Sequence, residues 1–228
     1  TDYNISLNET DGSPRESSIS GFTGLIDFSF FGTDSEINYG IAFNSLRTNF
    51  KFKNPFSVIL GQSQNTTEIG GFFKYRYVKG PLIIEPSFRL QYYASLSEFS
   101  PEPRIGIKFK LSDVIRLKFA GVLYSQNLLA ASNEIDVVNL FTGFLSGPEE
   151  QIFKLNTTEV AYKNIQTATH LIGGVEYEYS ERLNFNVEVY FKDFSQLIVV
   201  NRNKLLPADP NFSTESGQAY GFDIAADY

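Results

Sequence analysis

Residues 183–192 read LNFNVEVYFK, and an apolar or aromatic side chain stands at every second position of this stretch. Residues 104–111 read RIGIKFKL and repeat the pattern, with Arg104, Lys108 and Lys110 on the polar side. A period of two is typical of a β-strand that has one apolar and one polar face. On strands of about ten residues, this alternation is typical of a membrane barrel, in which one face meets lipid and the other meets water.

The composition fits such a barrel and excludes several other classes of protein. The 228 residues include no Cys, which excludes disulfides and thiolate chemistry, and they include no run of about 18 apolar residues that would form a transmembrane helix. Aromatic residues make up 15% of the chain, which fits aromatic girdles at the two membrane surfaces. The net charge of -7 argues against nucleic acid as a partner. Because the sequence begins at Thr1 without Met or an apolar leader, we expect a mature or trimmed chain.

About nine strands are predicted, and the connections between them alternate in length. Tight turns follow the odd-numbered strands, and longer loops near 46–66, 95–102, 126–165 and 194–217 follow the even-numbered ones. Outer-membrane barrels have this layout, with turns in the periplasm and loops outside the cell. A soluble β-sandwich or jelly roll is the alternative, but it has little reason to keep this order. The predicted strands span about 19–31, 36–45, 67–78, 81–94, 103–111, 114–125, 166–179, 183–193 and 218–228.

The odd strand number predicts an incomplete barrel. Bacterial barrels usually have an even number of strands, and a bare sheet edge is not tolerated in lipid. We therefore expect an all-β fold, a transmembrane antiparallel β-barrel, of which residues 1–228 form one segment while a plug domain and further strands lie outside this sequence. The alternative is a tenth strand within 126–165, at 141–145 or 152–155, which would close a barrel of ten strands.

Four segments, in the order in which they occur, resemble the middle and late barrel of TonB-dependent outer-membrane receptors, and most closely the Bacteroidetes-type, SusC-like members. The resemblance covers about 100–228 by motif and 19–100 only by pattern. It implies a barrel of about 22 strands closed by a plug, and an N-terminal box that contacts TonB; neither the plug nor the box is recognisable in this sequence. The segments are EPRIGIKFKL (102–111), HLIGGVEYEY (170–179), VEVYFKDF (187–194) and GQAYGFDI (217–224).

The resemblance implies a receptor in the outer membrane of a Gram-negative bacterium, which imports a large or scarce nutrient with energy delivered through TonB. Glycans, peptides, siderophores and cobalamin are typical nutrients of that family. The partners that it implies are outer-membrane lipid, TonB, and a SusD-like surface lipoprotein lid or other outer-membrane subunits. Two alternatives stay open: a receptor-like barrel that serves as a structural or accessory subunit of an outer-membrane complex, and a passive porin.

The polar face of the predicted strands carries charges that must be compensated. Pairing the strands across the turn near 112–114 places Lys110 opposite Arg116 and Lys108 opposite Lys118, and like charges that face each other destabilise a sheet. We therefore expect acidic neighbours on the adjacent strands. The expected contacts are Arg116–Glu178, Lys118–Glu176, Lys74–Glu85 and Glu85 beside Lys110.

We interpret these residues as a lumen-facing ladder of charges that stiffens the wall. Contact with an acidic plug surface, or passage of an anionic substrate, is the alternative interpretation. The near-cancellation of the charges favours the structural role, because an anion-selective pore would keep an uncompensated field. The ladder comprises Lys74, Glu85, Arg104, Lys108, Lys110, Arg116, Lys118, Glu176 and Glu178.

No catalytic, metal or cofactor site is predicted. His170 is the only histidine, and without Cys or a second His a zinc site is not expected. A serine triad would need His170 and a G-x-S-x-G turn, which the sequence lacks. We interpret His170 as a solvated residue of the wall, opposite Lys192, and expect no enzymatic activity.

The predicted loop at 126–165 is too apolar to be freely solvated. We expect it to fold over the mouth of the barrel or to contact a partner. Its apolar residues are Leu128, Leu129, Val137, Val138, Leu140, Phe141, Phe144 and Leu145.

Overall fold

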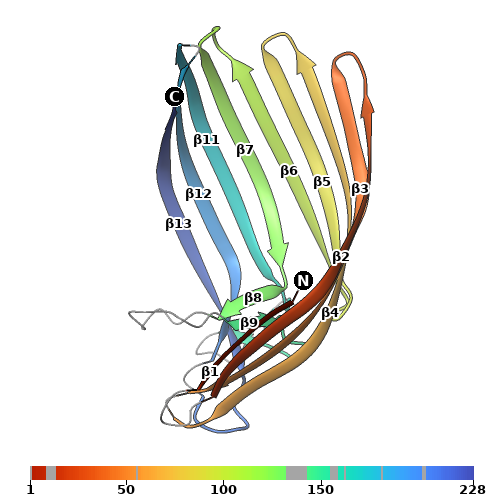
Figure 1. Ribbon diagram of the computed structural model, residues 1–228, viewed down its shortest axis with the longest axis vertical. Helices are drawn as coiled ribbons and strands as arrows, with labels where there is room; N and C mark the ends of the chain where they lie inside the picture. Colours follow the sequence, from red (N-terminus) through yellow and green to blue (C-terminus); the bar gives the residue numbers. More distant parts are fainter. Residues whose placement is uncertain are drawn as a thin grey trace.

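The computed structural model describes residues 2–8, 14–54, 56–131, 143–154, 159–161, 163–180, 182–201 and 204–228. These residues form an eleven-stranded sheet and a separate two-stranded hairpin (Figure 1). No helix among them is long and apolar enough to cross a membrane. In order across the large sheet, the strands are β1 (Asp2–Asn8), β2 (Pro14–Phe31), β3 (Ser35–Lys53), β4 (Ile59–Lys79), β5 (Leu82–Tyr93), β6 (Glu98–Lys110), β7 (Ile115–Gln126), β11 (Gln166–Ser180), β12 (Leu183–Val200), β13 (Phe212–Asp227) and β10 (Phe153–Lys154).

All nine predicted strands are present, as β2–β7 and β11–β13, and these nine pair with one another in antiparallel register. Tight turns join β2 to β3, β4 to β5, β6 to β7 and β11 to β12 at one end of the sheet, which we call the turn end (Figure 1). Gly80 has a φ of 55° in the turn between β4 and β5, a conformation that costs glycine little. The opposite end is the loop end.

The strands differ from prediction mainly in length. β3 continues to Lys53 and β4 begins at Ile59, so most of the predicted loop at 46–66 is strand. β12 likewise continues to Val200 and β13 begins at Phe212, which shortens the predicted loop at 194–217. The strands therefore extend well past the stretches whose alternation predicted them.

The sequence analysis missed these extensions because the face of the sheet that carries the apolar side chains changes along the strands. Between the turn end and Phe43, one face of β3 and its neighbours is apolar and exposed; Ile41, for example, is 62% exposed beside Ile26 of β2, which is 68% exposed. This apolar band continues across the sheet to β13, where Phe222 is 69% exposed. Beyond Phe43 the same face of β3 carries Ser45, Arg47, Asn49 and Lys51. We call it the outward face.

At the loop end the opposite face is covered by a small core. The hairpin of β8 (Leu128–Ala131) and β9 (Gly143–Ser146) lies on it, with β9 in contact with β2, β3 and β4 and β8 in contact with β12 (Figure 1). Four strands separate β4 from β12 in the sheet, so a short hairpin that reaches both must lie on the concave face. The buried residues of this core are Phe50, Leu129, Leu145, Ile152, Ala161 and Ile198.

Among the described residues, no tenth strand closes the sheet into a barrel. β9 and β10 occupy parts of the two stretches proposed for a tenth strand, but β9 pairs with β8, and β10 joins β13 through only two residues in parallel register. Residues 141, 142 and 155 lie outside the described part of the chain. Within the described part the large sheet is open, with β1 at one edge and β10 at the other.

Candidate functional site on the concave face

Charged side chains cluster on the concave face toward the turn end. The register places Lys108 opposite Lys118 and Lys110 opposite Arg116, as the sequence predicted. Glu176 of β11 lies between the two lysines, with its carboxylate oxygens 2.6 Å from Lys108 Nζ and 3.1 Å from Lys118 Nζ. The predicted pair of Arg116 with Glu178 is also present, at 2.7 Å. The acids of β11 thus neutralise the cations that face each other on β6 and β7.

Glu188 of β12 extends this cluster and was missed by the sequence analysis. Its carboxylate lies 2.7 Å from Lys118 Nζ and also accepts a hydrogen bond of 3.0 Å from the side-chain amide of Asn186. The signal was available, because Glu188 stands on the polar side of the alternation at 183–192. What the sequence did not reveal is that a lysine on β7 reaches across β11 to a third strand.

A second cluster of charges lies on β3, β4 and β5. Lys74 faces Glu85 at 3.5 Å, as predicted, and Arg76 lies 3.0 Å from the same carboxylate. Arg76 also lies 3.8 Å from Glu36 of β3. Neither Arg76 nor Glu36 was expected in the ladder. Their contacts link β3, β4 and β5 near the turn end.

The predicted contact between Glu85 and Lys110 is wrong. The register places Glu85 opposite Gly106, four residues from Lys110, which corresponds to about 13 Å along an extended strand. Lys110 instead pairs with Asp113 of the following turn, at 2.9 Å. Hydrogen bonding to Lys110 lowers the pKa of Asp113, which lies fully exposed in that turn.

Arg104, the remaining predicted member, lies apart from both clusters. Its guanidinium is 2.7 Å from the buried carboxylate of Glu102, which also accepts hydrogen bonds from the backbone N–H of Ser125 at 3.0 Å and from its hydroxyl at 2.7 Å. The guanidinium carbon of Arg104 lies 5.0 Å from the centre of the Tyr124 ring. Arg104 therefore belongs to a polar site between β6 and β7 rather than to the ladder.

His170 contributes to a group of aromatic rings on the same face. The register places it opposite Lys192, as predicted. Its ring centre lies 4.8 Å from that of Tyr124 and 6.2 Å from that of Phe194, both in edge-to-face geometry. These rings border a hollow of about 350 Å³. The sequence analysis treated His170 as a solvated residue and did not predict this packing.

Hydrogen bonds fasten the segment that follows β7 to the concave face. The side-chain amide of Gln62 donates to the carbonyl of Ser146 at 2.9 Å and accepts from its N–H at 3.1 Å. The Asn127 side chain donates to Thr66 at 2.8 Å and accepts from the N–H of Gly147 at 2.9 Å. Thr48 and Ser146 share a buried hydroxyl contact of 3.0 Å. The described part of the predicted 126–165 loop thus folds back over the sheet, as expected; Val137, Val138, Leu140 and Phe141 lie outside the described residues.

The charged side chains of the concave face form a network of ion pairs. Among the described residues, no group of three or more His, Cys, Asp or Glu side chains is placed to hold a metal ion. Each of the ladder acids Glu85, Glu176 and Glu178 lies within 4 Å of a cation. The concave face therefore presents paired charges of both signs.

No protein-family model matches the chain, and no curated protein matches it. Several solved structures share its fold, among them the following three. The siderophore receptor PirA from Pseudomonas aeruginosa is 11% identical with a TM-score of 0.61, and the match covers 93% of this chain and 40% of the receptor. The RagAB peptide importer is 12% identical with a TM-score of 0.54, and the match covers 94% of this chain and 28% of that one. OmpT of Vibrio cholerae, an outer-membrane protein, is 13% identical with a TM-score of 0.54, and the match covers all of this chain and 63% of OmpT.

These similarities show the fold of an outer-membrane β-barrel. The described strands thus confirm the all-β membrane-barrel architecture that alternation predicted. The chain spans about two fifths of the length of the siderophore receptor and a smaller share of the peptide importer. At such low identity the similarity is one of fold, and it is to receptors and importers of this architecture in general rather than to SusC-like members in particular.

Proposed function

We propose that this chain forms part of the barrel wall of an outer-membrane receptor that imports a nutrient with energy supplied through TonB. The observation that carries the proposal is the pairing of an exposed apolar band on the outward face with a charged, ion-paired concave face on the same strands. That combination is what a wall between lipid and water requires. The siderophore receptor and the peptide importer, whose fold the chain shares, support a receptor rather than an enzyme.

The sheet is, in this proposal, one segment of a larger closed barrel. Its open edges favour this interpretation, because unpaired backbone groups at a sheet edge are unfavourable in lipid. The concave face then lines the lumen, and the charge ladder stiffens it and faces a plug. The folded segment around β8 and β9 narrows the external mouth, where substrate and a surface lipoprotein of SusD-like kind would dock.

The substrate class that we propose is a molecule too large or scarce for diffusion, such as a glycan, peptide or siderophore. An accessory barrel subunit without transport is the first alternative. A passive porin is the second alternative.

Planar-bilayer recording separates the receptor from the porin. The protein purified from outer membranes should give no steady stepwise conductance if a plug closes the barrel, whereas a porin gives open steps at once. Deletion of TonB in the host should then abolish the nutrient uptake that depends on this protein. Open steps would overturn the receptor proposal, and gene-dependent uptake that survives TonB deletion would overturn its energised mechanism. Nutrient uptake that is unchanged by deletion of the gene itself would favour the accessory subunit.

A further inference from the structure

The outward face carries a groove at the loop end of β1–β4, lined by many polar side chains together with the exposed Ile59. The groove has a volume of about 680 Å³, within the range of small-molecule sites in proteins. Two rows of residues that lie side by side across the four strands line its outward side. The first row is Asn4, Ser18, Asn49 and Ser63, and the second is Ser6, Glu16, Lys51 and Gly61.

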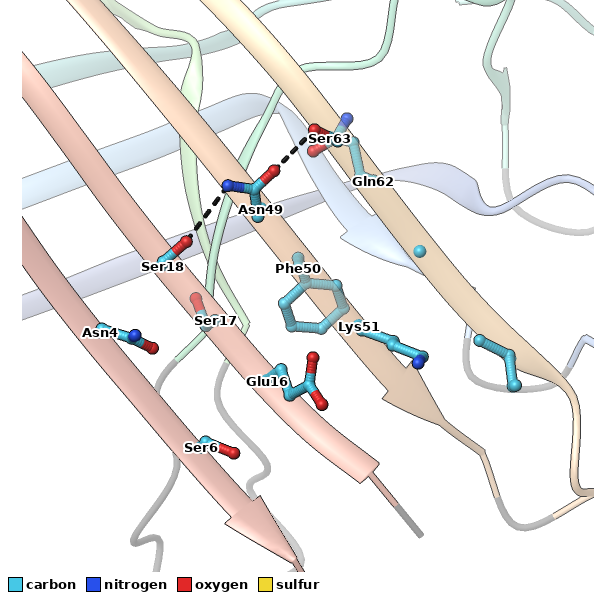
Figure 2. Close-up of a pocket in the computed structure, with 12 residues that line it drawn as sticks. Asn4, Ser6, Glu16, Ser17, Ser18, Asn49, Phe50, Lys51, Gln62 and Ser63 are labelled. Atoms are coloured by element: carbon cyan, nitrogen blue, oxygen red, sulfur yellow. Dashed lines mark hydrogen bonds between the residues drawn. The ribbon is translucent and has the colours of Figure 1, made fainter.

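The first row is already ordered by hydrogen bonds. Figure 2 shows Asn49 between Ser18 and Ser63; its amide donates to Ser18 at 3.2 Å, and its carbonyl accepts from Ser63 at 2.6 Å. Hydroxyl and amide groups can each donate and accept, so the row retains capacity for further partners. A ligand that carries many hydroxyl groups matches this surface.

The groove lies well beyond the apolar band on β3. Phe43 of β3 is the last apolar residue on the outward face of that strand, and Asn49 lies six residues further, which is about 20 Å along an extended strand. At a strand tilt of about 45°, that distance becomes about 14 Å in height above the edge of the band. Ordinary lipid headgroups reach only about 5–8 Å beyond the hydrocarbon core, so this height corresponds to the extended sugar headgroup of a glycolipid and not to a phospholipid headgroup.

Arg47 lies between the band and the groove and faces outward into solvent. No carboxylate of the described residues forms an ion pair with it, and the nearest acid in its row, Asp2, stands two strands away, or about 10 Å at ordinary strand spacing. Lys51 is also exposed, and among the described residues it forms no ion pair with Glu16, which lies opposite it in register. On the concave face, by contrast, acids neutralise Lys108, Arg116 and Lys118.

We propose that this groove binds the phosphorylated sugar headgroup of an outer-leaflet glycolipid. Arg47 binds a phosphate next to the acyl region, because guanidinium groups pair with phosphate in bidentate geometry. Ser18, Asn49 and Ser63 bind the hydroxyl groups of the sugars beyond it. An ordinary phospholipid headgroup would engage Arg47 but would not reach the groove. The inference rests on the proposed orientation, with the loop end outside the cell.

Native mass spectrometry of the protein purified from outer membranes tests the inference with two probes, rough-type lipopolysaccharide and phosphatidylglycerol. Wild-type protein should bind the lipopolysaccharide more tightly. Arg47→Gln should weaken that binding about tenfold, since a charged hydrogen bond of this kind contributes at least about 1.5 kcal/mol, and Arg47→Lys should restore part of it. Lys79→Gln, at the turn end of the same outward face, is the matched control and should leave binding unchanged.

A second variant tests the proposed sugar contacts without changing the charge of the protein. Asn49→Ala should weaken lipopolysaccharide binding and leave phosphatidylglycerol binding unchanged. Equal binding of lipopolysaccharide by wild type and Arg47→Gln, or equal affinity of wild type for the two lipids, would overturn the inference. Sucrose-gradient fractionation tells the two proposals apart: a protein that sediments with outer membranes but shows no loss in Arg47→Gln refutes only the glycolipid site, whereas its absence from those membranes refutes the proposed function as well.

Discussion

A single carboxylate explains how two strands with facing cations can lie side by side. Lys108 and Lys118 are cross-strand neighbours, and like charges in that position destabilise a sheet. Glu176 of β11 reaches both ammonium groups, and the three side chains are 25–37% exposed. Partial burial reduces the screening by water, so this triad contributes more to stability than an ordinary surface pair.

Glu176→Gln should therefore lower the stability of the folded protein. We expect a loss of about 1 kcal/mol, because the substitution leaves the repulsion between Lys108 and Lys118 uncompensated. Urea unfolding in detergent measures the change. Circular dichroism follows the unfolding, because the chain has no Trp for fluorescence. Glu36→Gln is the matched control, since Glu36 is 3.8 Å from its one cation in the described structure. A loss as large in the control, or no loss of stability in Glu176→Gln, would refute this role of Glu176.

At the scale of elements, the exchange of polarity along β3 separates two environments. Near the turn end its apolar side chains face outward, and near the loop end Phe50 turns to the concave face and is 5% exposed. The hairpin of β8 and β9 fills the space above it with Leu129 and Leu145, which are 4% and 1% exposed. At the loop end the apolar side chains are therefore buried inside the protein, as in a water-soluble domain. In the apolar band they face outward, toward lipid.

Leu145→Ala should detach this hairpin from the sheet. A buried leucine truncated to alanine costs about 2–5 kcal/mol, which is comparable to the docking energy of one short hairpin. We expect proteases added to intact outer membranes to cut within 143–154 in the variant and to spare that segment in the wild type. Leu123→Ala is the control, because Leu123 is 40% exposed on the outward face, where lipid fills the space. Rapid cutting of the wild type at this segment would show that the hairpin does not stay docked.

At the scale of the whole molecule, the sheet separates two media. The outward face offers apolar side chains from β2 to β13, and the concave face offers compensated charges and hydrogen-bonded polar groups. Neighbouring residues on one strand therefore experience opposite surroundings. Val187 of β12 lies on the apolar band and is 42% exposed, whereas Asn186 lies on the concave face beside Glu188.

Arginine substitutions at these two neighbours should have opposite outcomes. Val187→Arg places a charge in the lipid-facing band at a cost of about 2–4 kcal/mol near the midplane of the membrane, so less folded protein should reach the outer membrane. Asn186→Arg places the same side chain next to acids and should be tolerated. Heat-dependent gel mobility of outer-membrane fractions measures the folded amount. Similar levels of the two variants would contradict the assignment of the faces.

The sequence by itself determined the strands, the faces and much of the pairing, because alternation and tight turns are local properties that act through neighbouring residues. Parity counted from a turn was enough to place Arg116 beside Glu178 and His170 opposite Lys192. It failed for Glu85 and Lys110, because the register between β5 and β6 is fixed by the whole pair of strands and not by one turn.

Only the tertiary structure decided what lies at the loop end. The extension of β3 and β4, the docking of β8 and β9, and the polar groove outside them depend on contacts between residues far apart in the chain, such as Thr48 with Ser146. Beyond the membrane band water lies on the outward side, so the hydrophobic effect drives the apolar side chains to the concave face instead. Alternation alone does not reveal this reversal, because the period of two is the same whichever face is apolar.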